Sequence, residues 1–399
     1  MIELSTEPGL LIFGPGWMRA RRPAVLLRDP VEILRCDRVP DVMPALEEAA
    51  ARARSGMIVA GFVTYEAATA FDSAHVTHAS DGPLVWFGVY DPGSVVISRK
   101  LAPPSEPSGV ALRNTRFRLT RDEYAKAFGC IQQAIYEGDV YQINYTSPLT
   151  FEFVGSPLSL WHHLFHRQPV EFGAYIDTGD RQILSCSPEL FFELSGRSVL
   201  TRPMKGTIRR GHTEVEDDVL ATRLATDAKA QAENVMIVDL LRNDLSRCCE
   251  QGSVRVPDLF RIERYRTLIQ MTSEIEGRLR PGLGVPDLFR QLFPCGSVTG
   301  APKISAMKQI AKLESSPRDV YCGAIGWMHN DEAAFNVAIR TSVVRDGHGV
   351  LGIGSGIVAD SKVDDEFDEC LLKARFLTDG IGEDDAMEET IDAGGRRID

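Results

Sequence analysis

The chain has 399 residues, more than one compact core usually holds, so its length predicts either two domains or one large layered domain. Hydrophobic residues at 44% and charged residues at 25% are typical of a soluble globular protein, and no apolar run predicts a membrane span. The net charge of -12 argues against a nucleic-acid partner, whose phosphates would be repelled. The eight cysteines form no CxxC pair and the N-terminus does not resemble a signal peptide, so a reduced, cytoplasmic protein is expected.

Short strands are predicted in the first part of the chain, residues 1–110. Apolar runs at 57–71 and 84–91 are interrupted by Pro and Gly. The Pro- and Ser-rich segment 101–109 predicts a linker. We therefore expect the N-terminal part to be strand-rich and to complete the fold of the residues that follow.

An amphipathic helix is predicted directly after the linker, at residues 120–138. Thr120 and Glu123 have the spacing of a capping box, and apolar residues recur at helical intervals before Gly138. Both ends of this helix are therefore marked in the sequence.

Hairpins and helices alternate in the rest of the chain. Alternating residues predict hairpins at 172–194, at 322–344 and around the turn at 346–349. Helical patterns occur at 228–249, 301–314 and 363–378. Hairpin-joined strands with helices between them predict the α+β class, as a two-layer sandwich of antiparallel β-sheets with helices on the outside and the site between the sheets. We expect a catalytic domain at 115–380 and a disordered tail at 381–399.

Two glycine-rich stretches suggest nucleotide binding but lack the required residues. Residues 296–303 have Pro302 where a phosphate loop needs Gly, and residues 352–358 have Ile357 where a dinucleotide fold needs its third Gly. Both stretches offer backbone N–H groups suited to carboxylate oxygens. The alternative is that both are plain hairpin turns.

Several charged residues have two interpretations that the local pattern leaves open. Glu366, Glu369 and Lys373 share one face of a predicted helix, which is either a solvated face or part of a Mg²⁺ site, and Glu233 begins another helical run with the same ambiguity. Lys205 is either a surface charge or a desolvated nucleophilic amine. Glu189, at the end of a predicted strand, is either a solvated acid or a general acid.

Eight ordered blocks between about 115 and 378 resemble the signature of the chorismate-utilising enzymes, the family of anthranilate, aminodeoxychorismate, isochorismate and salicylate synthases. The blocks are SCSPEL, TRPMKGTIRRG, ENVMIVDLLRNDLSR, FPCGSVTGAPKISAM, YCGAIGW, FNVAIRT, GIGSGIVADS and DDEFDECLLKA. The resemblance implies that Mg²⁺ is bound by Glu233, Glu366 and Glu369. It also implies that chorismate is bound by a set comprising Gln142, Thr207, Tyr321, Arg340, Gly354, Gly356 and Lys373.

Two positions favour the aminodeoxychorismate synthases within this family. Lys205 occupies a position of the PxKGT motif where anthranilate synthases have Ala. Gln142 occupies the position of the Lys base in isochorismate and salicylate synthases, and a glutamine cannot deprotonate water. Met204 replaces the usual Ile with an apolar residue of similar volume.

The resemblance implies a transaminase-type amination in p-aminobenzoate and folate biosynthesis. Lys205 adds to C2 of chorismate while Glu189 protonates the departing C4 hydroxyl, and ammonia then displaces Lys205 by attack at C4. No cysteine has a glycine on each side, as a glutamine amidotransferase would require, so ammonia is expected from a separate glutaminase subunit. The alternatives are anthranilate synthase component I and a non-catalytic subunit that retains the fold.

Overall fold

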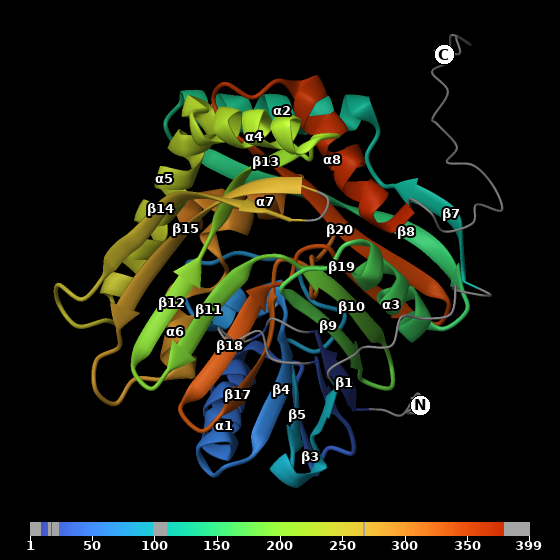
Figure 1. The fold of residues 1–399 in the computed structure, drawn as a ribbon, viewed down its shortest axis with the longest axis vertical. Coiled ribbons are helices and arrows are strands. Elements are labelled where there is room, and N and C mark those ends of the chain that lie inside the picture. Colours follow the sequence, from blue (N-terminus) through green and yellow to red (C-terminus); the bar gives the residue numbers. More distant parts are fainter. Residues whose placement is uncertain (1–8, 15–16, 18–23, 99–109, 266–267, 379–399) are drawn as a thin grey trace.

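The computed structural model describes residues 9–14, 17, 24–98, 110–265 and 268–378. The linker predicted at 101–109 and the tail predicted at 381–399 lie outside the described residues. Figure 1 shows the two sheets, with α2, α4 and α8 together at one end of the molecule and α1 at the other. None of the helices in the described ranges combines the length and the apolar character that a membrane span requires.

Two antiparallel sheets form the framework, which confirms the predicted α+β class. Sheet A has the order β16 (Gly300–Ala301), β8 (Gln142–Val154), β20 (His348–Ile357), β19 (Thr341–Arg345), β10 (Gln182–Ser187), β9 (Phe172–Asp177), β1 (Leu10–Phe13), β2 (Ala24–Leu27) and β6 (Val96–Ser98), with β7 (Ala111–Phe117) also on β8. Sheet B has the order β13 (Met204–Arg209), β15 (Leu268–Arg278), β12 (Ser198–Arg202), β11 (Leu190–Ser195), β18 (Glu332–Val337), β17 (Ala324–His329), β4 (Ile58–Val63), β5 (Val85–Tyr90) and β3 (Glu32–Cys36), with β14 (Arg255–Arg264) also on β15.

Helices cover the outer faces of the sheets. They are α1 (Val42–Arg54), α2 (Arg121–Tyr136), α3 (Pro157–Arg167), α4 (Glu214–Ala225), α5 (Ala228–Ser246), α6 (Val285–Leu292), α7 (Lys303–Leu313) and α8 (Val363–Thr378). Short 3₁₀ helices are η1 (Val39–Asp41), η2 (Tyr65–Ala70), η3 (Pro92–Ser94) and η4 (Gly296–Val298). The predicted capping box begins α2: the Glu123 N–H donates to the Thr120 hydroxyl, and the Thr120 N–H donates to the Glu123 carboxylate.

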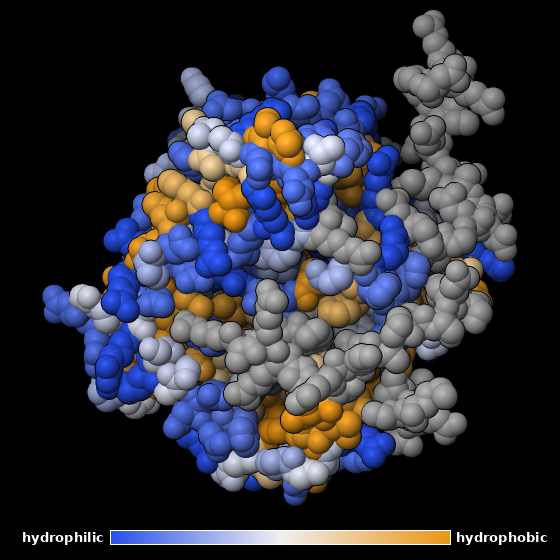
Figure 2. Space-filling view, in the orientation of Figure 1, coloured by the Kyte–Doolittle hydropathy of each residue, from blue (hydrophilic) through white to orange (hydrophobic). Residues whose placement is uncertain are grey.

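Three apolar layers hold the sandwich together. One layer packs α2, α3, α7 and α8 against sheet A, and another packs α1, α5 and α6 against sheet B. The third lies between the sheets and includes Phe172 and Ile183 from sheet A with Phe62 and Trp327 from sheet B. Among the residues coloured by hydropathy in Figure 2, hydrophilic ones predominate, with hydrophobic residues in smaller groups between them.

The N-terminal strands are divided between both sheets. β1 pairs with β9 in sheet A, and β4 pairs with β17 in sheet B. Only the first part of the run predicted as a strand at 57–71 is one, because the chain turns after β4 into η2, which buries Tyr65, Ala67 and Ala68. The N-terminal residues therefore pair directly with strands of the region predicted as the catalytic domain, residues 115–380.

The residue ranges predicted for two hairpins were too long. The hairpin expected at 172–194 ends with β10, because the chain crosses at Pro188 into β11 of sheet B. The hairpin expected at 322–344 ends with β18, and β19 lies in sheet A. At both points the chain passes from one sheet to the other.

The glycine-rich stretches are not hairpin turns. Most of 352–358 lies in β20 and pairs with β8 as far as Ile357. Residues 296–303 form η4, the short strand β16 and the start of α7. Small residues are required in β20 because neighbours approach closely: a Cβ at Gly352 would lie 2.1 Å from the Tyr321 ring.

Candidate active site

The crossover after β10 places Glu189, and the crossover after β18 places Arg340. The Val337 N–H donates to the Glu189 carbonyl at 3.0 Å, and the Cys186 N–H donates to the Arg340 carbonyl at 3.0 Å. The backbone of Arg340 is left-handed, with φ of 49°. The crossovers are therefore tied to neighbouring strands, and their two charged residues have fixed positions.

A bulge in β13 presents Lys205. The pairing of β13 with β15 shifts between Lys205 and Thr207, and Gly206 has φ of 79°, a conformation that glycine adopts without steric cost. The Lys205 amine donates to the Ser297 carbonyl of η4 at 3.2 Å. Thr207 lies beyond the bulge and is exposed, so the structure does not bring it into the buried group around Lys205.

Residues of sheet A meet Lys205 from the other side. A Cβ built on Gly356 of β20 would lie 3.4 Å from the Lys205 amine and 3.2 Å from the Gln142 amide nitrogen. Gln142 is 1% exposed, and neither atom of its amide group has a hydrogen-bond partner. A buried amide without partners is costly, which is consistent with a ligand that would complete its hydrogen bonds.

Glu189 has the protonation behaviour of a general acid. Its side chain is 2% exposed, and burial raises its pKa to about 7, although the Ser297 hydroxyl and the Lys205 charge both act to lower it. One of its carboxyl oxygens has no hydrogen-bond partner. A carboxyl group that titrates near neutrality beside an amine can hold and deliver a proton.

Arg340 is a half-buried cation without a counter-charge. Loss of solvation lowers the pKa of its guanidinium, and no carboxylate among the described residues forms an ion pair with it. A partly desolvated charge without a partner is unfavourable, and a guanidinium matches the geometry of a carboxylate. Arg340 therefore has the chemistry of a binding group for an anionic ligand.

Tyr321 and the open side of β20 complete the candidate substrate site. The Tyr321 ring lies against Gly352, and burial raises the pKa of its hydroxyl well above the usual value. β19 pairs with β20 only as far as Leu351. Alternate strand residues direct their backbone groups to the same side, so Gly354 and Gly356 both face this unpaired edge.

Three carboxylates gather from two helices beside Lys205. Glu233 lies on α5, and its pKa is raised by burial, with Glu366 and Glu369 on α8 adding to the rise. Lys373 donates to Glu369 at 2.7 Å and to the Gly354 carbonyl at 2.8 Å. The Lys373 charge lowers the pKa of Glu369. The residues predicted as metal ligands are thus close enough to influence one another.

The carboxylate group suits a hard cation by its chemistry. Oxygen ligands are those that Mg²⁺ prefers, and a dication would offset the burial and the carboxylate repulsion that together raise the pKa of Glu233. In the described ranges, however, no three His, Cys, Asp or Glu side chains are already arranged as a metal site. Glu366 accepts from the Ser361 hydroxyl at 2.7 Å, and Glu369 is paired with Lys373. The metal site remains a prediction.

Ser297 is a site residue that the sequence did not reveal. Its carbonyl accepts from Lys205, and its hydroxyl bonds to Glu189. The glycine-rich pattern around it indicated only free backbone N–H groups, and a serine in such a stretch carries no further local signal. The contacts of Ser297 are visible only in the structure, where η4 lies against β13 and against the crossover that carries Glu189.

Comparisons with known proteins identify the family of this chain. A family model described as chorismate binding enzyme matches residues 31–379. Aminodeoxychorismate synthase component 1 of Bacillus subtilis is 37% identical over 280 residues, which cover 70% of this chain but only 58% of that protein. Anthranilate synthase component 1 of Methanothermobacter marburgensis is 34% identical over 337 residues, covering 79% of this chain and 73% of that protein.

Solved structures share the fold. Anthranilate synthase component I from Streptococcus pneumoniae has a TM-score of 0.77 at 25% identity, covering 90% of this chain and 93% of that chain. The menaquinone-specific isochorismate synthase from Escherichia coli has a TM-score of 0.74 at 18% identity, covering 94% and 88%. Since the family model matches more than half of its residues, the chain belongs to the family of chorismate binding enzymes.

Proposed function

We propose that this chain is the synthase subunit of an aminodeoxychorismate synthase and converts chorismate and ammonia to 4-amino-4-deoxychorismate. The observation that carries the proposal is the position of the Lys205 amine, which is bonded to Ser297 and lies beside Gly356 and Gln142. An amine there can act as a nucleophile toward a ring bound between the two sheets. The similarity to proteins named aminodeoxychorismate synthase supports the same reaction.

The proposed chemistry assigns separate roles to Lys205 and Glu189. The amine of Lys205 forms a bond to C2, the two ring double bonds shift, and the C4–O bond breaks. Glu189 donates the proton that converts the departing hydroxyl into water, and its raised pKa leaves it partly protonated near pH 7. Ammonia then bonds to C4, the double bonds shift back, and Lys205 leaves with its electron pair, so the enolpyruvyl ether stays intact.

Anion binding orients the substrate in this proposal. Arg340, Tyr321, Lys373 and the backbone amides of Gly354 and Gly356 hold the carboxylates of chorismate. Glu233, Glu366 and Glu369 would hold Mg²⁺, which supplies positive charge beside the ring carboxylate. The half-buried, unpaired Arg340 supports the assignment because an anionic ligand would give it the counter-charge that it lacks.

We further propose that ammonia comes from a separate glutamine amidotransferase subunit, and that the reaction belongs to p-aminobenzoate and folate biosynthesis in the cytoplasm. All cysteines except Cys130 are buried. None has the flanking glycines of a reactive amidotransferase cysteine, which supports an external source of ammonia. Chorismate, Mg²⁺ and ammonium salt should therefore suffice for a test without glutamine.

Anthranilate synthase component I is the second candidate, favoured by a relative and a solved structure with that name. The product formed from chorismate, Mg²⁺ and ammonium salt distinguishes the two, because anthranilate fluoresces and aminodeoxychorismate does not. Anthranilate as the product would reject the proposal. A non-catalytic subunit is disfavoured because Gln142 and Glu189 are buried with unpartnered polar atoms, which a site without a ligand has no reason to retain.

Lys205→Ala tests the nucleophile. We expect a large fall in aminodeoxychorismate formation, with any remaining turnover shifted toward amination at C2, because the lost side chain leaves space beside Gly356. Wild-type enzyme quenched with chorismate in the absence of ammonia should contain a modified Lys205 peptide by mass spectrometry. No adduct, together with an unchanged product from the variant, would show that Lys205 only binds substrate.

A further inference from the structure

A buried ion pair between Glu314 and Arg318 lies beside the proposed site. The exposed fractions of the two side chains are 4% and 3%. The guanidinium donates to both carboxylate oxygens of Glu314, at 2.6 and 2.8 Å, and lies 4.6 Å from the centre of the Tyr65 ring. The proposed chemistry uses neither charge directly.

The remaining donors of Arg318 join two segments of the site. Nη1 donates to the Val298 carbonyl at 2.7 Å, and Nη2 donates to the Asn144 carbonyl at 2.8 Å. Val298 directly follows Ser297, and Asn144 is two residues beyond Gln142 on β8. Arg318 therefore connects β8, the strand of Gln142, with η4, the 3₁₀ helix whose Ser297 contacts Lys205.

Glu314 holds a second point on β8. One of its oxygens accepts from both the N–H and the hydroxyl of Thr146, at 2.9 and 2.8 Å. The Thr146 methyl group packs so closely against β20 that a Cβ at Gly354 would lie 2.5 Å from it. The ion pair thus also contacts β8 where this strand packs against the proposed carboxylate-binding amides of β20.

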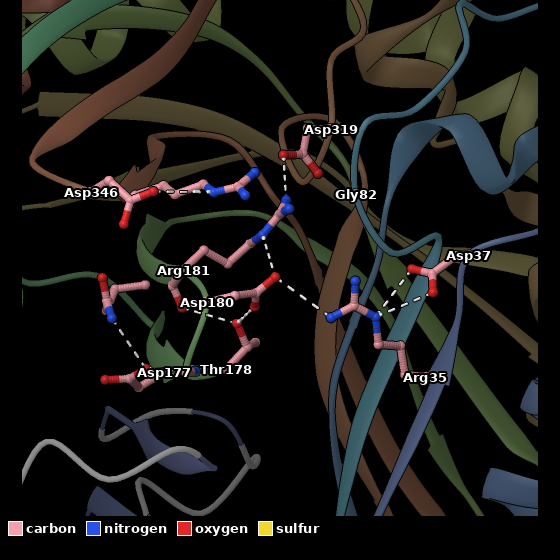
Figure 3. A network of polar contacts seen from close by, with 12 residues as sticks. Arg35, Asp37, Gly82, Asp177, Thr178, Asp180, Arg181, Asp319 and Asp346 are labelled. Carbon is pink, nitrogen blue, oxygen red and sulfur yellow. Dashed lines mark hydrogen bonds and ion pairs between the residues drawn. The ribbon is translucent and has the colours of Figure 1, made fainter.

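A separate network lies on the other side of Arg318. Glu66 accepts the backbone N–H groups of Arg318 and Asp319, at 2.7 and 3.1 Å. The Asp319 carboxylate accepts from buried Arg181 at 3.0 Å, and Figure 3 shows Arg181 between Asp319 and Asp180. Within the described residues, this second ion pair has no hydrogen bond to β8 or to residues 295–299.

We infer that Arg318, supported by Glu314, is a positioning residue. It sets the distance between Gln142 on β8 and Ser297 of η4, the 3₁₀ helix beside Lys205. This inference rests on the proposed function. Stability alone does not explain the pair, because apolar residues of similar volume often replace a buried ion pair without loss. A guanidinium differs from such apolar side chains because its planar group of N–H donors holds several acceptors in fixed directions. Displacing reacting groups by about 1 Å can lower a rate about 100-fold.

The test is the double variant Arg318→Met with Glu314→Gln, which leaves no buried charge unpaired. The matched control is Arg181→Met with Asp319→Asn, which removes a neighbouring ion pair that does not contact β8 or η4. We expect the first variant to lose about 100-fold in kcat for chorismate consumption and the control to stay within about threefold of wild type. Equal losses in the two variants would overturn the inference.

The pH dependence of kcat distinguishes displacement of Ser297 from partial unfolding of the variant. Partial unfolding lowers kcat but does not move its pH profile. Glu189 faces Ser297, Lys205 and Cys295. The Ser297 hydroxyl acts to lower the pKa of Glu189, so a displaced η4 lets that pKa rise. The alkaline limb of kcat should therefore move to higher pH in the Arg318 variant but not in the control. An unmoved limb would contradict a positioning role.

Arg318→Lys is the second variant, because it keeps a charge beside Glu314 but cannot span both carbonyls. The alkaline limb of its kcat should also move to higher pH, and its kcat should fall about tenfold. If neither Arg318 variant folds, the pair is a requirement of the fold and the positioning role is refuted. Chorismate consumption is measured whatever the product, so a wild-type enzyme that makes anthranilate would reject the proposed function and leave this test intact.

Discussion

Gly356→Ala separates the requirements of the proposed site from those of the fold. The added Cβ would lie 3.2 Å from the Gln142 amide nitrogen and 3.4 Å from the Lys205 amine. Both atoms are ends of flexible side chains, and the backbone of Gly356 is not left-handed, so strain is small. We expect the free energy of unfolding to change by less than about 1 kcal/mol.

Activity should respond far more strongly than stability to this substitution. The methyl group occupies the space between Lys205 and Gln142, where the ring of chorismate is proposed to bind. Because a misplacement of about 1 Å can cost about 100-fold, we expect kcat/KM for chorismate to fall by about that factor. Steady-state consumption of chorismate with ammonium salt measures the loss, and thermal unfolding followed by circular dichroism measures stability.

Gly354→Ala provides the contrast two residues earlier on the same strand. Its Cβ would lie 2.5 Å from the Tyr145 carbonyl oxygen, a backbone atom that cannot move without disturbing the pairing of β8 and β20. We expect it to destabilise the fold by about 1–3 kcal/mol. Our reasoning about the site is refuted if Gly356→Ala keeps wild-type kcat/KM, or if it destabilises the protein as much as Gly354→Ala does.

Four further predictions concern Glu189, Glu369 and Thr120. kcat should fall as pH rises through about 7, where Glu189 loses its proton, and Glu189→Gln should abolish this limb. Because the folded-state pKa of Glu189 is raised, stability is lost between pH 4.5 and about 7, so Glu189→Gln should become more stable relative to wild type over that window in urea titrations. Glu369→Gln should require more Mg²⁺ for half-maximal activity, and an unchanged Mg²⁺ titration would reject its assignment as a ligand. Thr120→Ala, which removes the capping box of α2, should cost about 1 kcal/mol of stability without changing kcat, as measured by thermal unfolding and chorismate turnover.

Local signals in the sequence were sufficient for four of the eight α-helices of the described residues, namely α2, α5, α7 and α8, whereas α1, α3, α4 and α6 were not predicted. The capping box at Thr120 and Glu123 marked the start of α2, and the pattern at 363–378 matched α8. Such elements depend on residues a few positions apart, so their spacing is visible in the chain. The alternation of residues that predicted the hairpins did not show where β10 and β18 end. A period of two identifies the buried face of a strand but not the sheet to which the strand belongs.

The sequence by itself determined the α+β class, and through resemblance to a family it identified the candidate residues. Read alone, Lys205 and Glu189 kept two interpretations each, because the pKa and reactivity of a charged side chain depend on burial and on neighbours distant in the chain. Only the tertiary structure decided that Glu189 is buried with a raised pKa, that Lys205 meets Gln142 and Gly356, and that Thr207 is exposed. The physical reason is that this site forms where two sheets meet, and contacts between sheets leave no periodic pattern in either strand.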